Sequence, residues 1–171
     1  MTSKQNAATV LGLLDATWNC GDIAAIEHAV ASDHLEHEPD GDEVGREHLM
    51  QTILAYRAAF PDLQMSFDDQ ICADDQVVTR WTATGTHLGV LDGIPPTGRA
   101  AQVRGVFIHR LAHGRIAETW TSFDELGLLQ QLGVIPVAAR GNHTSAVQSD
   151  GKDQAPVADR PPAHRTARVH Q

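Results

Sequence analysis

A carboxylate, Asp124, stands at the junction of two expected elements. It follows an extended segment, 116–123, and precedes a helical run, 125–132. Trp120 and Leu126 flank it, so we expect partial desolvation, and burial raises the pKa of a carboxyl group. A carboxyl group tuned in this way can accept and return a proton near neutral pH. The same position also suits a helix N-cap, so a catalytic and a structural interpretation of Asp124 both stay open.

Histidines are the second group of residues that could take part in a reaction. His34 and His37 lie three residues apart in a brief extended segment, 33–38, spaced so that both could face one side. His109 shares one strand face with Phe107, and it could bind an enolate oxygen, orient Asp124, or serve as a buried structural residue. Strand parity pairs these two side chains but does not show which face points inward.

Metal and cofactor signatures are missing from the sequence. Ten histidines are present, but those outside the C-terminal tail show no HxxxH or HxH spacing on one element. There is also no Gly-rich phosphate loop, nucleophile elbow or CxxC motif. We therefore expect chemistry that uses neither a metal nor a cofactor.

Bulk composition restricts the class of protein. The chain has 171 residues, 42% of them hydrophobic, which suits one domain with a sizeable core. Its net charge of -9 argues against nucleic acid or an anionic membrane as a partner. No apolar run is long enough to span a bilayer, and the N-terminus does not resemble a secretory signal. Cys20 and Cys72 are isolated, so we expect reduced thiols and a cytoplasmic location.

Periodicity changes along the chain from helical to extended. Apolar spacing near 3.6 predicts the early helices, period two predicts the later strands, and the polar segment 39–45 is expected to be a loop. Helices followed by long antiparallel strands predict an α+β fold, a curved sheet wrapped around a pocket with the N-terminal helices closing its wide end. The expected helices are 7–18, 23–30 and 46–59, and the main strands are 76–88, 101–111 and 116–123.

The last segment, 138–171, has a different character. It has almost no apolar periodicity and contains three prolines among polar residues, with five Lys or Arg against three Asp. Such a segment buries too little apolar surface to offset its ordering entropy. We expect a folded domain over 1–137 and a disordered or loosely draped tail after it.

Three segments resemble the SnoaL-like polyketide cyclases of the nuclear transport factor 2-like superfamily. They are YRAAFPDLQ at 56–64, RWTATGTHLG with GIPPTGR at 80–99, and GRIAETWTSFDELGLLQQLG at 114–133. The similarity runs in register from about Val10 to about Pro136. It implies a cone-shaped barrel and a homodimer or homotetramer that binds a small polyketide-like molecule.

The resemblance also implies roles for single residues. Asp124 corresponds to the general acid/base, and His37 to a histidine that faces the cavity. His34 and His109 stand where the family more often has an aromatic residue, and His87 falls within a family motif near the pocket rim.

Aromatic and charged strand residues complete the expected site. Trp81, Trp120 and Phe107 are expected on the pocket wall. Arg80 would enter the site if its strand face pointed inward, where it would need a carboxylate partner such as Glu118.

The function that follows is a cofactor-independent cyclase that closes a ring by intramolecular aldol condensation. Asp124 would remove a proton from a carbon flanked by carbonyl groups, while His37 and His109 polarise oxygens. Two alternatives stay open. One is another enzyme on the same fold, an isomerase or an epoxide hydrolase that uses Arg80 with Asp124. The other is a non-catalytic small-molecule-binding protein.

Overall fold

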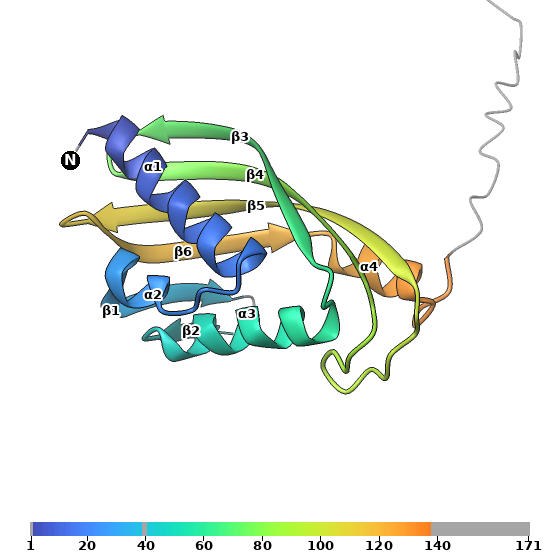
Figure 1. Cartoon of the computed structure of the whole chain (residues 1–171). Helices are drawn as coiled ribbons and strands as arrows, with labels where there is room; N and C mark the ends of the chain where they lie inside the picture. The colour runs from blue at the N-terminus through green and yellow to red at the C-terminus, as the bar shows by residue number, and fades with distance from the viewer. Residues whose placement is uncertain (1, 39–40, 138–171) are drawn as a thin grey trace, which may run out of the picture. The chain divides into compact units, whose positions relative to one another are not determined.

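The computed structural model describes residues 2–38 and 41–137. Within these residues a six-stranded sheet carries helices on one face (Figure 1). The strand order is β2-β1-β6-β5-β4-β3. The strands are β1 (Val30–Glu38), β2 (Gly41–Val44), β3 (Gln64–Ala73), β4 (Gln76–Thr86), β5 (Ala100–Ala112) and β6 (Arg115–Phe123).

The α+β class and the curved sheet expected from the sequence are confirmed. Two details differ from the expectation. The pair β1 and β6 is parallel, whereas all other neighbours are antiparallel. The sheet is also open, because β2 and β3 are its edges, and packed helices rather than further strand pairing cover its concave face.

Tight turns set the register of the two long hairpins. His113 and Gly114 join β5 to β6 with φ values of 51° and 79°, and Asp74 joins β3 to β4 with a φ of 50°. Two consecutive residues with positive φ match the twist of the flanking strands, and glycine adopts such a φ without strain. A bulge between Arg110 and Leu111 then shifts the β5–β6 register by one residue, and this shift places His109 of β5 directly opposite Thr119 of β6.

The helices are α1 (Ser3–Leu14), α2 (Ala25–Ala29), α3 (Glu47–Ala59) and α4 (Glu125–Leu132). A capping box formed by Thr2 and Gln5 begins α1. The helix continues as a π-helical turn, η1 (Asp15–Asn19), which holds Trp18. The expected helix 7–18 therefore starts earlier and ends in a wider turn, a feature that proteins often place at functional sites.

Side chains from two other elements fix the π-helical turn. Arg57 of α3 donates hydrogen bonds to the carbonyl oxygens of Trp18 and Asn19. Asn19 in turn accepts a hydrogen bond of 2.7 Å from the backbone N–H of Met65 in β3 and donates one of 3.0 Å to its carbonyl oxygen. This turn, and with it Trp18, is held against both α3 and the sheet.

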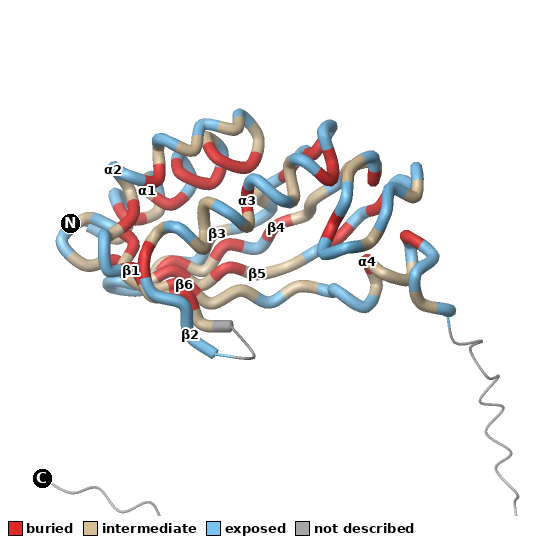
Figure 2. The backbone as a smooth tube through the Cα atoms, turned by 90° about the horizontal axis from the view of Figure 1, so that it is seen from below, coloured by how far each residue is buried: buried red, intermediate tan, exposed pale blue. Residues whose placement is uncertain are grey.

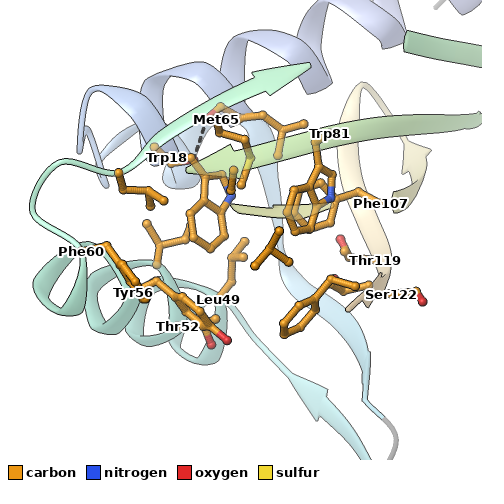
Figure 3. A pocket seen from close by; sticks show the side chains of 18 of the residues that line it. Trp18, Leu49, Thr52, Tyr56, Phe60, Met65, Trp81, Phe107, Thr119 and Ser122 are labelled. Carbon is orange, nitrogen blue, oxygen red and sulfur yellow. Dashed lines mark hydrogen bonds between the residues drawn. The ribbon is translucent and has the colours of Figure 1, made fainter. Parts of the chain in front are cut away.

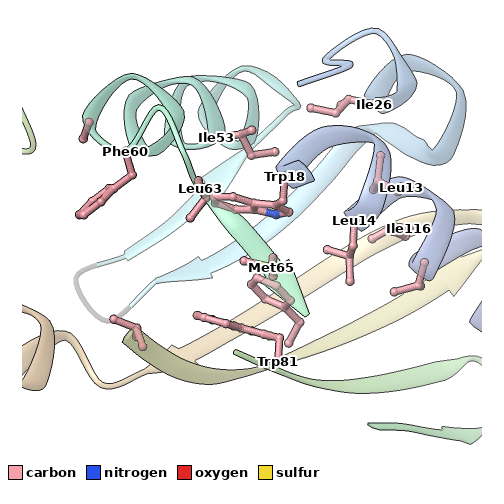
Figure 4. Close-up of a cluster of buried hydrophobic side chains, with 14 of the residues drawn as sticks. Leu13, Leu14, Trp18, Ile26, Ile53, Phe60, Leu63, Met65, Trp81 and Ile116 are labelled. Carbon is pink, nitrogen blue, oxygen red and sulfur yellow. The ribbon is translucent and has the colours of Figure 1, made fainter. Parts of the chain in front are cut away.

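The core lies between the helices and the concave face of the sheet. Figure 2 shows that both layers, the helices and the strands, contain buried residues. Figure 4 shows part of this cluster, which combines side chains of α1, α3 and the strands. Its labelled members are Leu13, Leu14, Trp18, Ile26, Ile53, Phe60, Leu63, Met65, Trp81 and Ile116.

Two sequence-based expectations about the first half were wrong. The segment predicted as a loop contains β2, a short polar edge strand whose residues are all exposed, so it lacks the alternation that marks a half-buried strand. Apolar spacing in 46–59 also predicts that Leu54 shares the inner face of this helix with Ile53, but Leu54 of α3 is 52% exposed.

Three further expectations concern the C-terminal tail, membrane-spanning helices and the two cysteines. The tail predicted over 138–171 lies outside the described residues. Within residues 2–38 and 41–137, no helix is both long and apolar enough to cross a membrane. Cys20 and Cys72 are free.

Candidate active site

A cavity of about 420 Å³ lies between the helices and the concave face of the sheet. The chain has three Trp, one Tyr and four Phe, and six of these eight aromatic residues line the cavity. They are Trp18, Tyr56, Phe60, Trp81, Phe107 and Phe123. A concave, mainly apolar cavity with a few polar groups is the usual form of a small-molecule site.

Five of these aromatic side chains form a continuous row of ring contacts that begins with Tyr56 on Trp18, at a centroid distance of 6.2 Å. Figure 3 labels Tyr56, Trp18, Phe107 and Trp81 of this row. Phe107 stacks on Trp81 with ring centroids 5.1 Å apart and on Trp18 with centroids 6.5 Å apart. Phe123 extends the row at 6.3 Å from Trp81. A Cβ atom at Gly105 would clash with the indole of Trp81, so this glycine lets the indole lie against the strand. The wall therefore presents flat aromatic surface to a bound molecule.

Polar groups gather in one row across three strands. Glu36 of β1 is in register with Thr119 of β6, which is in register with His109 of β5. All three line the cavity, and all three are buried. His34, on the same face of β1, lies behind them with its Nε2 in a 2.9 Å hydrogen bond with Oγ1 of Thr119. One end of an otherwise apolar cavity thus carries a carboxyl group, a hydroxyl group and an imidazole.

Burial lowers the pKa of both histidines of this region. Desolvation, with a smaller contribution from the nearby His34, lowers the pKa of His109 to about 3. Desolvation also lowers the pKa of His34, partly opposed by the backbone of Gly45. Nδ1 of His109 is buried and has no hydrogen-bond partner among the described residues. A neutral imidazole carries one N–H, so it can donate a hydrogen bond to a carbonyl oxygen without being an acid itself.

Asp124 does not lie in this cavity. It is exposed, so the expected desolvation is wrong. Its side chain caps α4, where Oδ1 accepts a 2.8 Å hydrogen bond from the N–H of Gly127. A Cβ atom at Gly127 would clash with this carboxylate, so the glycine makes room for the cap. The structure therefore supports the capping interpretation of Asp124.

His37 and Trp120 lie on the opposite face of the sheet. Their rings stack with centroids 4.4 Å apart and an interplanar angle of 11°. His37 donates from Nδ1 to Asp42 at 3.0 Å, and Arg110 donates from Nε to Glu118 at 3.1 Å. Because alternate strand residues point to opposite faces, His37 is separated from His34 and Glu36. Its predicted place in the pocket is wrong, and so is that of Trp120.

Two further predicted positions lie outside the cavity lining. Arg80 is exposed, because its neighbour Trp81 occupies the concave face. His87 is fully buried, but it packs on Phe60 and accepts a 3.3 Å hydrogen bond at Nδ1 from the N–H of Thr97. It thereby holds the connection between β4 and β5 rather than facing the cavity.

The structure keeps Trp81, Phe107 and His109 together on the wall and adds Glu36 and Thr119, which sequence reasoning missed. The sequence did contain a signal for Glu36. In HLEHE, Glu36 stands two residues after His34 and one residue before His37. Along a strand it therefore shares a face with His34 and not with His37. Thr119 carries no chemical signature of its own, and only the pairing of β6 with both β1 and β5 makes it central.

Comparison with known proteins identifies the family. The profile of the SnoaL-like polyketide cyclases matches residues 8–132. The chain belongs to the SnoaL-like polyketide cyclase family. A search of curated proteins found no match.

Solved structures agree with this family membership. The candidate hydroxylase AclR from Streptomyces galilaeus is 27% identical with a TM-score of 0.73, over 81% of this chain and 87% of that one. The candidate polyketide cyclase IdmH from Streptomyces antibioticus is 32% identical with a TM-score of 0.66, over 75% and 99%. A candidate SnoaL-like polyketide cyclase from Jannaschia sp. CCS1 shares the fold, at 24% identity and a TM-score of 0.72, over 78% and 94%.

The lining of the cavity is chemically restricted. The cavity described above has the form of a small-molecule site. None of its lining residues within the described part of the chain is Lys or Arg. Its polar chemistry is confined to carboxyl, hydroxyl, imidazole and indole groups.

Proposed function

We propose that this chain is a polyketide cyclase that closes a ring by intramolecular aldol condensation without a cofactor. The observation that carries the proposal is the aromatic cavity with a polar row at one end, formed by Glu36, Thr119 and His109. A polyketide presents flat, partly aromatic surface together with reactive carbonyl groups. The aromatic wall suits the first feature, and the polar row suits the second.

The cavity contributes first by shaping the substrate. An aldol closure needs the nucleophilic carbon and the carbonyl carbon to approach each other within one flexible molecule. Holding the chain in that conformation removes much of the entropic barrier. The aromatic wall on the sheet and the apolar side chains of α3, among them Leu49 and Ile53, enclose the molecule on two sides.

His109 contributes by polarising the carbonyl group that is attacked. Its neutral ring donates one hydrogen bond to the carbonyl oxygen, which gains negative charge as the new carbon–carbon bond forms. Such a donor in a water-poor site stabilises the transition state more than the ground state. His109 is a poor proton acceptor in the same site, because its pKa is about 3. A second group must therefore take the proton from carbon.

One rival function loses its structural support. An epoxide hydrolase that uses Arg80 with Asp124 needs both side chains at one site, whereas both are exposed and neither lines the cavity. A non-catalytic binding protein stays as an outcome of the experiment below.

The test combines turnover with a blocked cavity. The pure protein is incubated with an uncyclised anthraquinone ester while the visible spectrum is recorded. We expect conversion by the wild type, loss of conversion in Ala83→Phe, which fills the cavity, and retention in Thr82→Phe, which points to the other face of β4. Saturable binding without conversion would favour the binding protein. Equal conversion by both variants would contradict the assignment to this cavity.

We also propose that the chain forms a homodimer or homotetramer and works in the cytoplasm. The outer face of the sheet carries half-buried apolar residues, namely Leu35, Val106, Ile108 and Trp120, and this supports pairing through that face. The two free cysteines fit a reducing compartment. Sedimentation equilibrium of the wild type and of Ile108→Asp tests the assembly, and a monomeric wild type would contradict it.

A further inference from the structure

Glu36 occupies an unusual place for a carboxyl group. It lies in the middle of β1, its side chain is only 5% exposed, and it lines the apolar cavity. Burying a carboxyl group in such a site is costly, and proteins accept this cost mainly where the group has a function. The second carboxyl group on the cavity wall is Glu125, which is exposed in the first turn of α4. Among the described lining residues, Glu36 is therefore the one buried carboxyl group.

The neighbours of Glu36 complete a reaction site. Thr119 stands between Glu36 and His109, so the carboxyl group and the imidazole are two strands apart, and adjacent strands are about 4.8 Å apart. They are thus separated by about 10 Å at the backbone, which leaves room between their side chains for the two reacting carbons of one substrate. A carboxyl group and a hydrogen-bond donor on opposite sides of a reacting pair are what an aldol closure needs.

We propose that Glu36 is the catalytic acid/base of this protein and that it works with His109 across the cavity. The carboxylate of Glu36 takes a proton from the substrate carbon that lies between two carbonyl groups. The electron pair of that C–H bond becomes an enolate, which forms a new bond to the carbonyl carbon beside His109. The C=O π electrons move to oxygen, and the alkoxide then takes the proton back from Glu36. Atoms and charges balance without an oxidant or a reductant.

Thr119 and His34 act in this scheme as positioning residues. Nε2 of His34 and Oγ1 of Thr119 share a 2.9 Å hydrogen bond, which orients the hydroxyl group between Glu36 and His109. His34 is fully buried behind the row, so it acts through Thr119 and not by touching the substrate. This role needs only a hydrogen bond from His34 and not its protonation, which burial makes unfavourable.

The inference rests on the proposed function, and isotope exchange separates the two. The uncyclised anthraquinone ester is incubated in D₂O, and two rates are followed above the buffer background. One is deuterium entry at the carbon between the carbonyl groups, and the other is ring closure. We expect Glu36→Gln to lower both rates by about 10²–10⁴-fold with little change in KM. His109→Phe should lower closure while exchange continues.

Matched variants exclude simple structural effects. Glu43→Gln removes a carboxylate from the exposed residue directly opposite Glu36 on β2, and it should keep full activity. Glu36→Asp retains the carboxyl group and should recover part of the exchange rate. Thermal unfolding and circular dichroism establish that each variant is folded.

Each outcome has one meaning. Wild-type turnover together with wild-type exchange in a folded Glu36→Gln variant would overturn the role of Glu36 and leave the proposed function intact. Absence of both exchange and closure in the wild type would overturn the proposed function and the inference with it. If Glu36→Gln does not fold, the decision rests on Glu36→Met, which has a side chain of similar length without the carboxyl group. Exchange at the wild-type level in a folded Glu36→Met variant would contradict the role.

Discussion

The two faces of the sheet carry similar residue types with different consequences. On the concave face, His109, Glu36 and Trp81 are buried around a cavity. On the outer face, His37 and Trp120 stack in partial contact with solvent, and the carboxylate of Glu118 is paired with Arg110. The chemistry of these side chains therefore depends on the face and not on the residue type. Burial removes the concave set from water and lowers the pKa of His109, whereas hydration and pairing satisfy the outer set.

The largest contrast in stability should be between the two tryptophans. Trp81→Ala removes a buried ring that contacts Phe107 and Phe123, and such a change costs about 3–5 kcal/mol. Trp120→Ala should cost less than half of that, because the ring is half-buried. Urea unfolding of both variants measures the difference. Equal costs would show that the cavity wall is not the better packed face.

Variants of the two histidines should also differ strongly in activity. His109→Phe keeps a ring on the aromatic wall but removes the hydrogen-bond donor, and we expect ring closure to fall by about 10²–10³-fold. His37→Phe should leave closure within a factor of about two, because its stack on Trp120 lies on the outer face. Steady-state kinetics with the anthraquinone ester provides the measurement. The opposite order would restore the catalytic interpretation of His37.

The pH dependence of stability should also differ between variants of His109 on the concave face and His37 on the outer face. The unfolded chain takes up a proton at His109 below about pH 6.5, whereas burial holds its pKa in the folded protein at about 3. The folded state therefore loses up to about 1.4 kcal/mol per pH unit as the pH falls through this window. His109→Phe should have a flatter pH profile, and His37→Phe should follow the wild type. Urea unfolding at pH 7 and pH 4.5 tests this difference, and parallel profiles would contradict it.

The smallest effect should come from Asp124. Loss of an N-cap in Asp124→Ala should cost about 1 kcal/mol, and Asp124→Asn should cost only a few tenths because asparagine caps equally well. Ring closure should be unchanged in Asp124→Asn. A folded Asn variant with closure reduced 100-fold or more would return the acid/base role to Asp124 and remove it from the cavity row.

Local sequence patterns predicted much of the fold and part of the site. Apolar spacing predicted the helix that contains Leu13 and Leu14, and period-two spacing predicted the last two strands, 101–111 and 116–123. Such signals depend on neighbours in the chain, which is why they survive without tertiary information. The strand β2 was missed because an exposed polar edge strand has no such signal. Family resemblance predicted the fold and the family, but its assignment of Asp124 to the site disagrees with the exposed position of that residue.

The sequence by itself determined which residues share a face. Strand parity joins Phe107 with His109 and joins His34 with Glu36. The same parity separates His34 and Glu36 from His37, so the expectation that His34 and His37 could face one side was wrong. Only the tertiary structure decided which of these faces encloses the cavity. That choice depends on the curvature of the sheet and on the packing of α1 and α3 against one side of it. Both arise from contacts between segments far apart in the chain, and no local pattern encodes the side from which the helices approach.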